Sequence, residues 1–230
     1  MVTTRWMMAA ASVMLAGILA QPATAAGPLG AHNPSHAPLV QAAASADQAK
    51  VATTKAALRD LWIGHVFWVR NVVVAGLAGD QSAQSVAEQQ VVANAQAIAA
   101  SIEPFYGAAA KEKLFALLAN HYGAIKAYLD SSIAKNGDKQ AEATTKLINN
   151  AGEIASFLST ANRHLAKDAV EGLLQAHGGH HIAQIQELQD KEYAREAQTW
   201  VDMSQHMYVI SDAIADALAK QFPAKFHRAS

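Results

Sequence analysis

The feature that most constrains the fold is a helical repeat of apolar residues that runs from about Asp47 almost to the end of the chain. Apolar side chains recur three and four positions apart, and Ala, Leu, Gln, Glu and Lys are abundant throughout. Runs of β-branched residues, which strands favour, are few outside Val72-Val73-Val74. The sequence therefore predicts an all-α protein.

Short turn signals divide this repeat into separate helices. Four of them fall at Gly79-Asp80, 104–107, 136–138 and 159–164. The four helices that they delimit are each about 20 to 28 residues long. Because short turns force consecutive helices to run antiparallel, the pattern predicts an up-down antiparallel bundle of four long helices.

The C-terminal region adds one to three further helices. A short helix is expected from about Lys167 to His177, then a break at Gly178-Gly179, then helical sequence to Gln221 before Pro223 ends it. The bundle domain is accordingly placed at 46–223, with a tail at 224–230.

The first 26 residues have the pattern of a cleaved signal peptide. Arg5 supplies the positive charge, 7–20 form an uncharged and largely apolar run, and Ala23-Thr24-Ala25 fits the small-residue rule for cleavage after Ala25 or Ala26. An uncleaved anchor is the alternative, but the run is shorter than the roughly 20 residues of a membrane span, and Pro22 follows it. We therefore expect a periplasmic or secreted protein with no membrane span after cleavage.

A flexible linker is expected at 27–45, where Pro28, Pro34 and Pro38 disfavour a packed helix. Cysteine is absent, which excludes disulfides and thiolate metal sites. With 18 basic and 19 acidic residues, the chain has no charge excess that would indicate nucleic acid as a partner. The oligomeric state is left open.

Four polar residues occupy positions in the apolar stripes of the four long helices. They are His65, Asn94, His121 and Asn150, one on each helix. Counting residues from the turns, at about 1.5 Å of rise per residue, places them at similar heights. A buried polar group without a partner costs roughly 1 to 3 kcal/mol, so such a layer calls for an explanation. It either fixes the register of the helices or binds a ligand.

Three more histidines are candidates to complete a metal site. His177 and His181 are four residues apart, which would place both on one face of a continuous helix, although His180 is an alternative second member. His206 is flanked by Met203 and Met207. Imidazoles suit zinc, and imidazole with thioether suits copper, whereas the two methionines also fit an ordinary core stripe.

Arg70 follows His65 by five residues and is expected at the flank of the core stripe. There it would bind an anionic ligand or pair with a carboxylate such as Glu153, unless it only stacks on a tryptophan.

The segment Leu61-Trp62-Ile63-Gly64-His65-Val66-Phe67-Trp68-Val69-Arg70 resembles the Leu-Trp-x-x-His-Val-x-Trp-x-Arg opening of an uncharacterised family of small bacterial helical proteins. The likeness continues through Asn94, 104–107, His121, 149–150 and the ending Lys220-Gln221-Phe222-Pro223. Some members are labelled glycosyltransferases, but a nucleotide-sugar fold needs alternating strands and helices.

Three functions follow from these observations. The leading one is a non-enzymatic exported bundle whose polar layer binds a transition metal, zinc or copper, or a small polar ligand. The metal ligands would be His65, His121, His177, His181 and His206, and the small ligand would contact His65, Arg70, Asn94, His121 and Asn150. The alternatives are a structural or protein-interaction bundle, and an enzyme with a histidine general base. The usual metalloprotease, di-iron, phosphate-loop and hydrolase motifs are absent from the sequence.

Overall fold

The structure is a computed structural model that describes the backbone of residues 37–226 and the side chains of residues 48–226. Over this part of the chain it contains helices and no strands, which confirms the all-α prediction. The helices are α1 (Ala37–Ala78), α2 (Gln81–Tyr106), α3 (Ala108–Ile133), α4 (Gly137–Ala161), α5 (Lys167–Gln189), α6 (Tyr193–Gln221) and the single turn α7 (Pro223–Phe226). The predicted signal peptide, residues 27–36 of the predicted linker and residues 227–230 of the predicted tail lie outside the described residues. The first part of that tail, 224–226, belongs instead to α7, because the Phe226 side chain is buried in the core.

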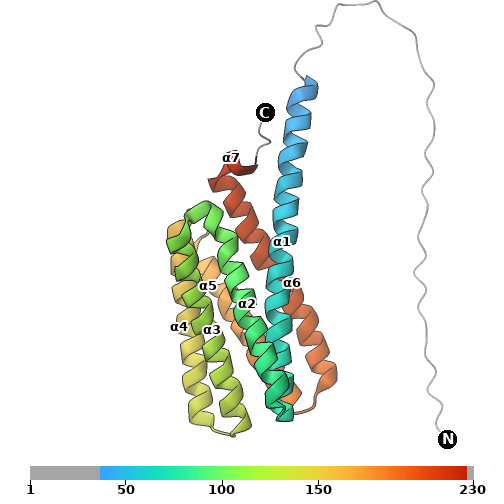
Figure 1. The fold of residues 1–230 in the computed structure, drawn as a ribbon, viewed down its shortest axis with the longest axis vertical. Helices are drawn as coiled ribbons and strands as arrows, with labels where there is room; N and C mark the ends of the chain where they lie inside the picture. Colours follow the sequence, from blue (N-terminus) through green and yellow to red (C-terminus); the bar gives the residue numbers. More distant parts are fainter. Residues whose placement is uncertain (1–36, 227–230) are drawn as a thin grey trace, which may run out of the picture. The chain divides into compact units, whose positions relative to one another are not determined.

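The six long helices form a closed ring in which direction alternates from one helix to the next (Figure 1). Each helix packs against its successor in the chain, and α6 returns to pack against α1. The helices α1, α3 and α5 also contact one another across the interior. Since neighbours run antiparallel, these three inner helices run in the same direction.

The turns that join the helices are built by the residues that predicted them. Asp80 caps α2, its side chain accepting a hydrogen bond from the backbone N–H of Ala83 at 3.0 Å. Asn136 caps α4 in the same way, accepting from the N–H of Lys139 at 3.0 Å. Gly107 separates α2 from α3 with a φ of 83°, in the left-handed region that glycine tolerates.

The predicted break at Gly178-Gly179 is wrong, because α5 continues through both glycines. A Cβ at Gly178 would lie 2.9 Å from a methyl carbon of Leu147, so glycine here permits α4 and α5 to approach closely. The chain turns instead between Gln189 and Tyr193, where Lys191 adopts a φ of 61°. No glycine or proline marks that turn, which is why the sequence pattern did not predict it.

The first helix also differs from its prediction, since α1 begins at Ala37 and so includes the second half of the predicted linker. Within α1, the stretch Gln48–Ala78 is long and apolar enough to cross a membrane, but nearly half of its most apolar window is buried in the bundle. A buried core helix can have the same length and composition, so the stretch is only weak support for a span.

Candidate metal centre

Four histidines from the three inner helices meet in the interior of the bundle. His65 comes from α1, His121 from α3, and His177 and His181 from α5. Their exposed fractions are 5%, 2%, 1% and 1%, so all four imidazoles are buried. Each histidine occupies a position in the apolar stripe of its helix, which turns the ring toward the other inner helices.

The four rings surround a common point. One potential ligand atom from each histidine lies within 4.8 Å of the other three. The six distances between ring centroids range from 4.5 Å, for His177 and His181, to 6.4 Å, for His121 and His181. Four imidazoles bound tetrahedrally to one zinc ion would have centroids about 5 Å apart and ligand nitrogens about 3.4 Å apart. The rings therefore need to move by only an ångström or so to bind an ion.

His177 and His181 already have the separation of two ligands on one ion. Their Nε2 atoms lie 3.2 Å apart and share a hydrogen bond, so one of the two nitrogens donates to the other. One turn of α5 separates the two residues, so both rings project from the same face of the helix. A metal ion can replace the shared proton while both nitrogens stay close to their present positions.

Asn150 fixes the orientation and the protonation of His121. The side-chain Nδ2 of Asn150 donates to the backbone carbonyl of Leu117 at 3.1 Å, which leaves its Oδ1 to face the imidazole. The Nδ1 of His121 lies 3.1 Å from that oxygen and must donate to it. The Nε2 of His121 consequently carries the lone pair and is directed away from Asn150, as in metal sites where a hydrogen bond holds the ligating ring.

Each of the four imidazoles has one buried nitrogen without a hydrogen-bond partner. These atoms are Nε2 of His65, Nε2 of His121, Nδ1 of His177 and Nδ1 of His181. Leaving a buried polar atom unpaired costs roughly 1 to 3 kcal/mol. A bound ion would satisfy the first two directly, since no other described group is paired with them.

Burial keeps the four imidazoles neutral. Loss of hydration lowers the pKa of His65 to about 3, with the nearby His121 adding to the effect. Burial also lowers the pKa of His121 to about 4, opposed in part by the hydrogen bond that its Nδ1 donates to Asn150. For His177 and His181 burial and the neighbouring imidazoles hold the pKa well below its ordinary value. Neutral imidazole is the form that binds metals.

The structure places the remaining predicted site residues outside this group. Asn94 is half-buried, and its Nδ2 donates to the carbonyl of Leu61 at 2.9 Å, so it ties α2 to α1. His206 donates from Nε2 to the carbonyl of Leu173 at 2.8 Å and lies beside His180, with a centroid distance of 5.5 Å. Met203 and Met207 belong to an apolar core cluster, as expected of a core stripe.

Arg70 pairs with Glu196 and not with Glu153, which corrects the suggested partner. The guanidinium donates to both carboxylate oxygens, at 2.6 Å and 3.0 Å. Glu196 lies in the first turn of α6 and is 4% exposed, and the paired Arg70 lowers the pKa of its carboxyl. Glu153 instead lines a surface hollow between α3 and α4. The sequence did not predict this pair, because the start of α6 was not predicted. The helix face on which Glu196 lies was therefore unknown.

Gln184 is a buried polar residue that the sequence reasoning missed. It is 0% exposed, its Nε2 donates to Glu196 at 3.0 Å, and its Oε1 has no partner. Its spacing from His177 and His181 on α5 is seven and three residues, so a continuous helical stripe across the glycines would have revealed it.

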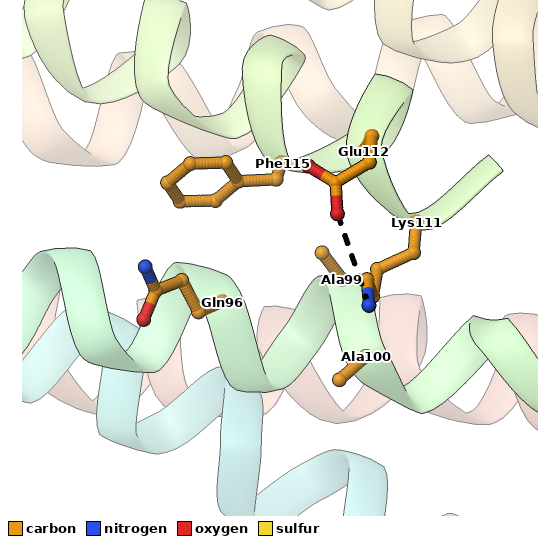
Figure 2. Close-up of a pocket in the computed structure, with 6 residues that line it drawn as sticks. All are labelled: Gln96, Ala99, Ala100, Lys111, Glu112 and Phe115. Carbon is orange, nitrogen blue, oxygen red and sulfur yellow. Dashed lines mark ion pairs between the residues drawn. The ribbon is translucent and has the colours of Figure 1, made fainter. Parts of the chain in front are cut away.

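A separate cavity of about 320 Å³ lies between α2 and α3 (Figure 2). Its lining consists of Gln96, Ala99, Ala100, Lys111, Glu112 and Phe115. The amine of Lys111 pairs with Glu103 at 3.0 Å and with Glu112 at 3.8 Å. The one lysine among the lining residues is therefore paired with two carboxylates.

The fold and the site together define a six-helix antiparallel bundle with a buried cluster of four histidines whose spacing is compatible with a metal ion. Comparison of the chain with protein families, curated proteins and solved structures gave no match.

Proposed function

We propose that this protein is an exported, non-enzymatic bundle that binds one transition metal ion between His65, His121, His177 and His181. The observation that carries the proposal is the convergence of four neutral imidazoles from three helices within 4.8 Å of one another. A layer that only fixed helix register would need partners for its nitrogens, yet Nε2 of His65 and Nε2 of His121 are buried and unpaired.

Zinc is the ion that the donor set favours. Four imidazole nitrogens suit Zn²⁺, which structural sites almost always bind through four ligands in a tetrahedral arrangement. The thioethers that would favour copper are packed in the apolar core, so copper is the second choice. Four protein ligands also leave no open position for a substrate, which is typical of structural and carrier sites and not of catalytic ones.

Isothermal titration of the mature chain with Zn²⁺, Cu²⁺ and Ni²⁺ tests the proposal. We expect one tight zinc site per chain, and its loss in His65→Ala and in His121→Ala. His164→Ala is the matched control, because that histidine is exposed. Negligible and equal binding by all four proteins would rule out the metal site, and a copper preference would change the ion assigned.

Export is supported by the sequence pattern of residues 1–26 alone. Mass spectrometry of the protein recovered outside the cytoplasm should show a chain that begins at Ala26 or Gly27. Recovery of the full-length chain in the membrane fraction would support the anchor instead.

A further inference from the structure

A second pair of histidines lies at the seam between α5 and α6, next to the buried four. His180 and His206 are half-buried, and their ring centroids are 5.5 Å apart. Two imidazoles on one zinc ion would have centroids at about that separation, roughly 5 Å. His180 directly precedes His181 on α5, so the second pair lies beside the buried cluster along this helix.

The geometry leaves His206 able to bind a metal. Its Nε2 lies 2.8 Å from the backbone carbonyl of Leu173 and, because a carbonyl only accepts, this nitrogen must donate. The Nδ1 of His206 therefore carries the lone pair. Asp202, one turn earlier on α6, is exposed and close enough to act electrostatically on His180, so it supplies a negative charge beside the two rings.

The helix α5, which carries histidines of both the buried cluster and the surface pair, contains a glycine that packing does not require. A Cβ at Gly178 would collide with Leu147, but a Cβ at Gly179 would meet nothing within 4 Å. Gly179 is exposed and lies in the middle of α5, where glycine weakens a helix relative to alanine. This turn, between His177 and His181, is consequently a place where α5 can open locally.

We infer that His180 and His206, with the negative charge of Asp202 nearby, form a weaker surface site that captures the metal ion and delivers it to the four-histidine centre through the turn at Gly179. The inference rests on the proposed function, since the delivered ion is the one bound at the centre. The four imidazoles of the centre are at most 5% exposed, so an ion needs a route through the helices to reach them.

Zinc titration and stopped-flow mixing with Zn²⁺ test the surface site. The wild-type chain should bind two ions, one tightly and one weakly. Changing both surface histidines, His180→Asn with His206→Asn, should remove the weak phase and slow the filling of the tight site about tenfold, as expected when local ion concentration is lost. One ion per wild-type chain, or filling at the wild-type rate in the double variant, would overturn the capture role.

Gly179→Ala tests the route, and Gly172→Ala is its control. Gly172 also lies in α5 and its Cβ would also meet nothing within 4 Å, but it is away from the histidines. Gly179→Ala should slow filling several-fold more than Gly172→Ala does. Equal rates in the two variants would remove the turn from the proposal.

A variant without the centre separates the two ideas. His65→Leu with His121→Leu, checked for helicity by circular dichroism, should keep the weak zinc phase and lose the tight one. If the wild-type chain shows only the weak phase, the four-histidine centre and delivery to it both fail. If it shows only the tight phase, the centre stands and the surface site fails.

Discussion

Acid should destabilise the metal-free protein at a pH where most bundles are still near their maximum stability. The four imidazoles are neutral in the folded state, with a pKa of about 3 for His65, about 4 for His121, and well below the ordinary value for His177 and His181. In the unfolded chain each titrates near pH 6.5. As the pH falls below 6.5 the unfolded state gains protons that the folded state does not, so the free energy of unfolding decreases until the folded pKa is reached.

The size of the loss follows from the proton count. Each histidine that stays neutral in the folded state lowers the free energy of unfolding by about 1.4 kcal/mol per pH unit below 6.5. Between pH 7.5 and pH 5.5 four such groups remove about 5 kcal/mol, a large part of the roughly 5 to 15 kcal/mol that stabilises a domain. The paired carboxyls of Glu196 and Asp212 have lowered pKa values, so their contribution is lost only at lower pH, outside this window.

Urea denaturation in the presence of EDTA, followed by circular dichroism at several pH values, measures the loss. His65→Leu with His121→Leu should halve the pH dependence, and His164→Asn should leave it unchanged. A wild-type loss below about 2 kcal/mol over this range, or an undiminished slope in the double variant, would refute the assignment of four neutral buried imidazoles.

Three other predictions concern residues around the centre. Asn150→Ala should weaken zinc binding about 10- to 100-fold in a titration, because His121 loses the group that orients it; wild-type affinity would show that the hydrogen bond is not needed. Glu196→Gln should lower the free energy of unfolding by about 2 to 3 kcal/mol, since Arg70 loses a charged partner at a largely buried site. Urea denaturation at pH 7.5 measures this loss, and a change under about 0.5 kcal/mol would contradict the prediction. Gly178→Ala should lower the melting temperature because its methyl group would lie 2.9 Å from Leu147. Since Leu147→Ala removes the clash but also leaves a core cavity, the double variant should lose less stability than the sum of the two single losses. An unchanged melting temperature in Gly178→Ala would mean that α4 and α5 can separate freely.

Local sequence determined the class of fold. Apolar spacing sets which face of each helix is buried, and turn residues such as Asp80 and Asn136 form caps from their own neighbours, so both could be read without tertiary contacts. The same spacing identified His65 and His121 as core residues, since a histidine within an apolar stripe has to face inward. Where such local signals were missing, as at Lys191, the turn was not predicted.

Tertiary packing decided which of the buried polar residues meet. The register between α1, α3 and α5 depends on contacts far apart in sequence, and it is this register that brings one nitrogen of each histidine to within 4.8 Å of the others. The helix α5 continues through Gly178, which packs closely against Leu147, and this continuity puts His177 and His181 on one face. The partner of Arg70 was likewise set by where α6 begins relative to α1, a relation that no spacing within either helix encodes.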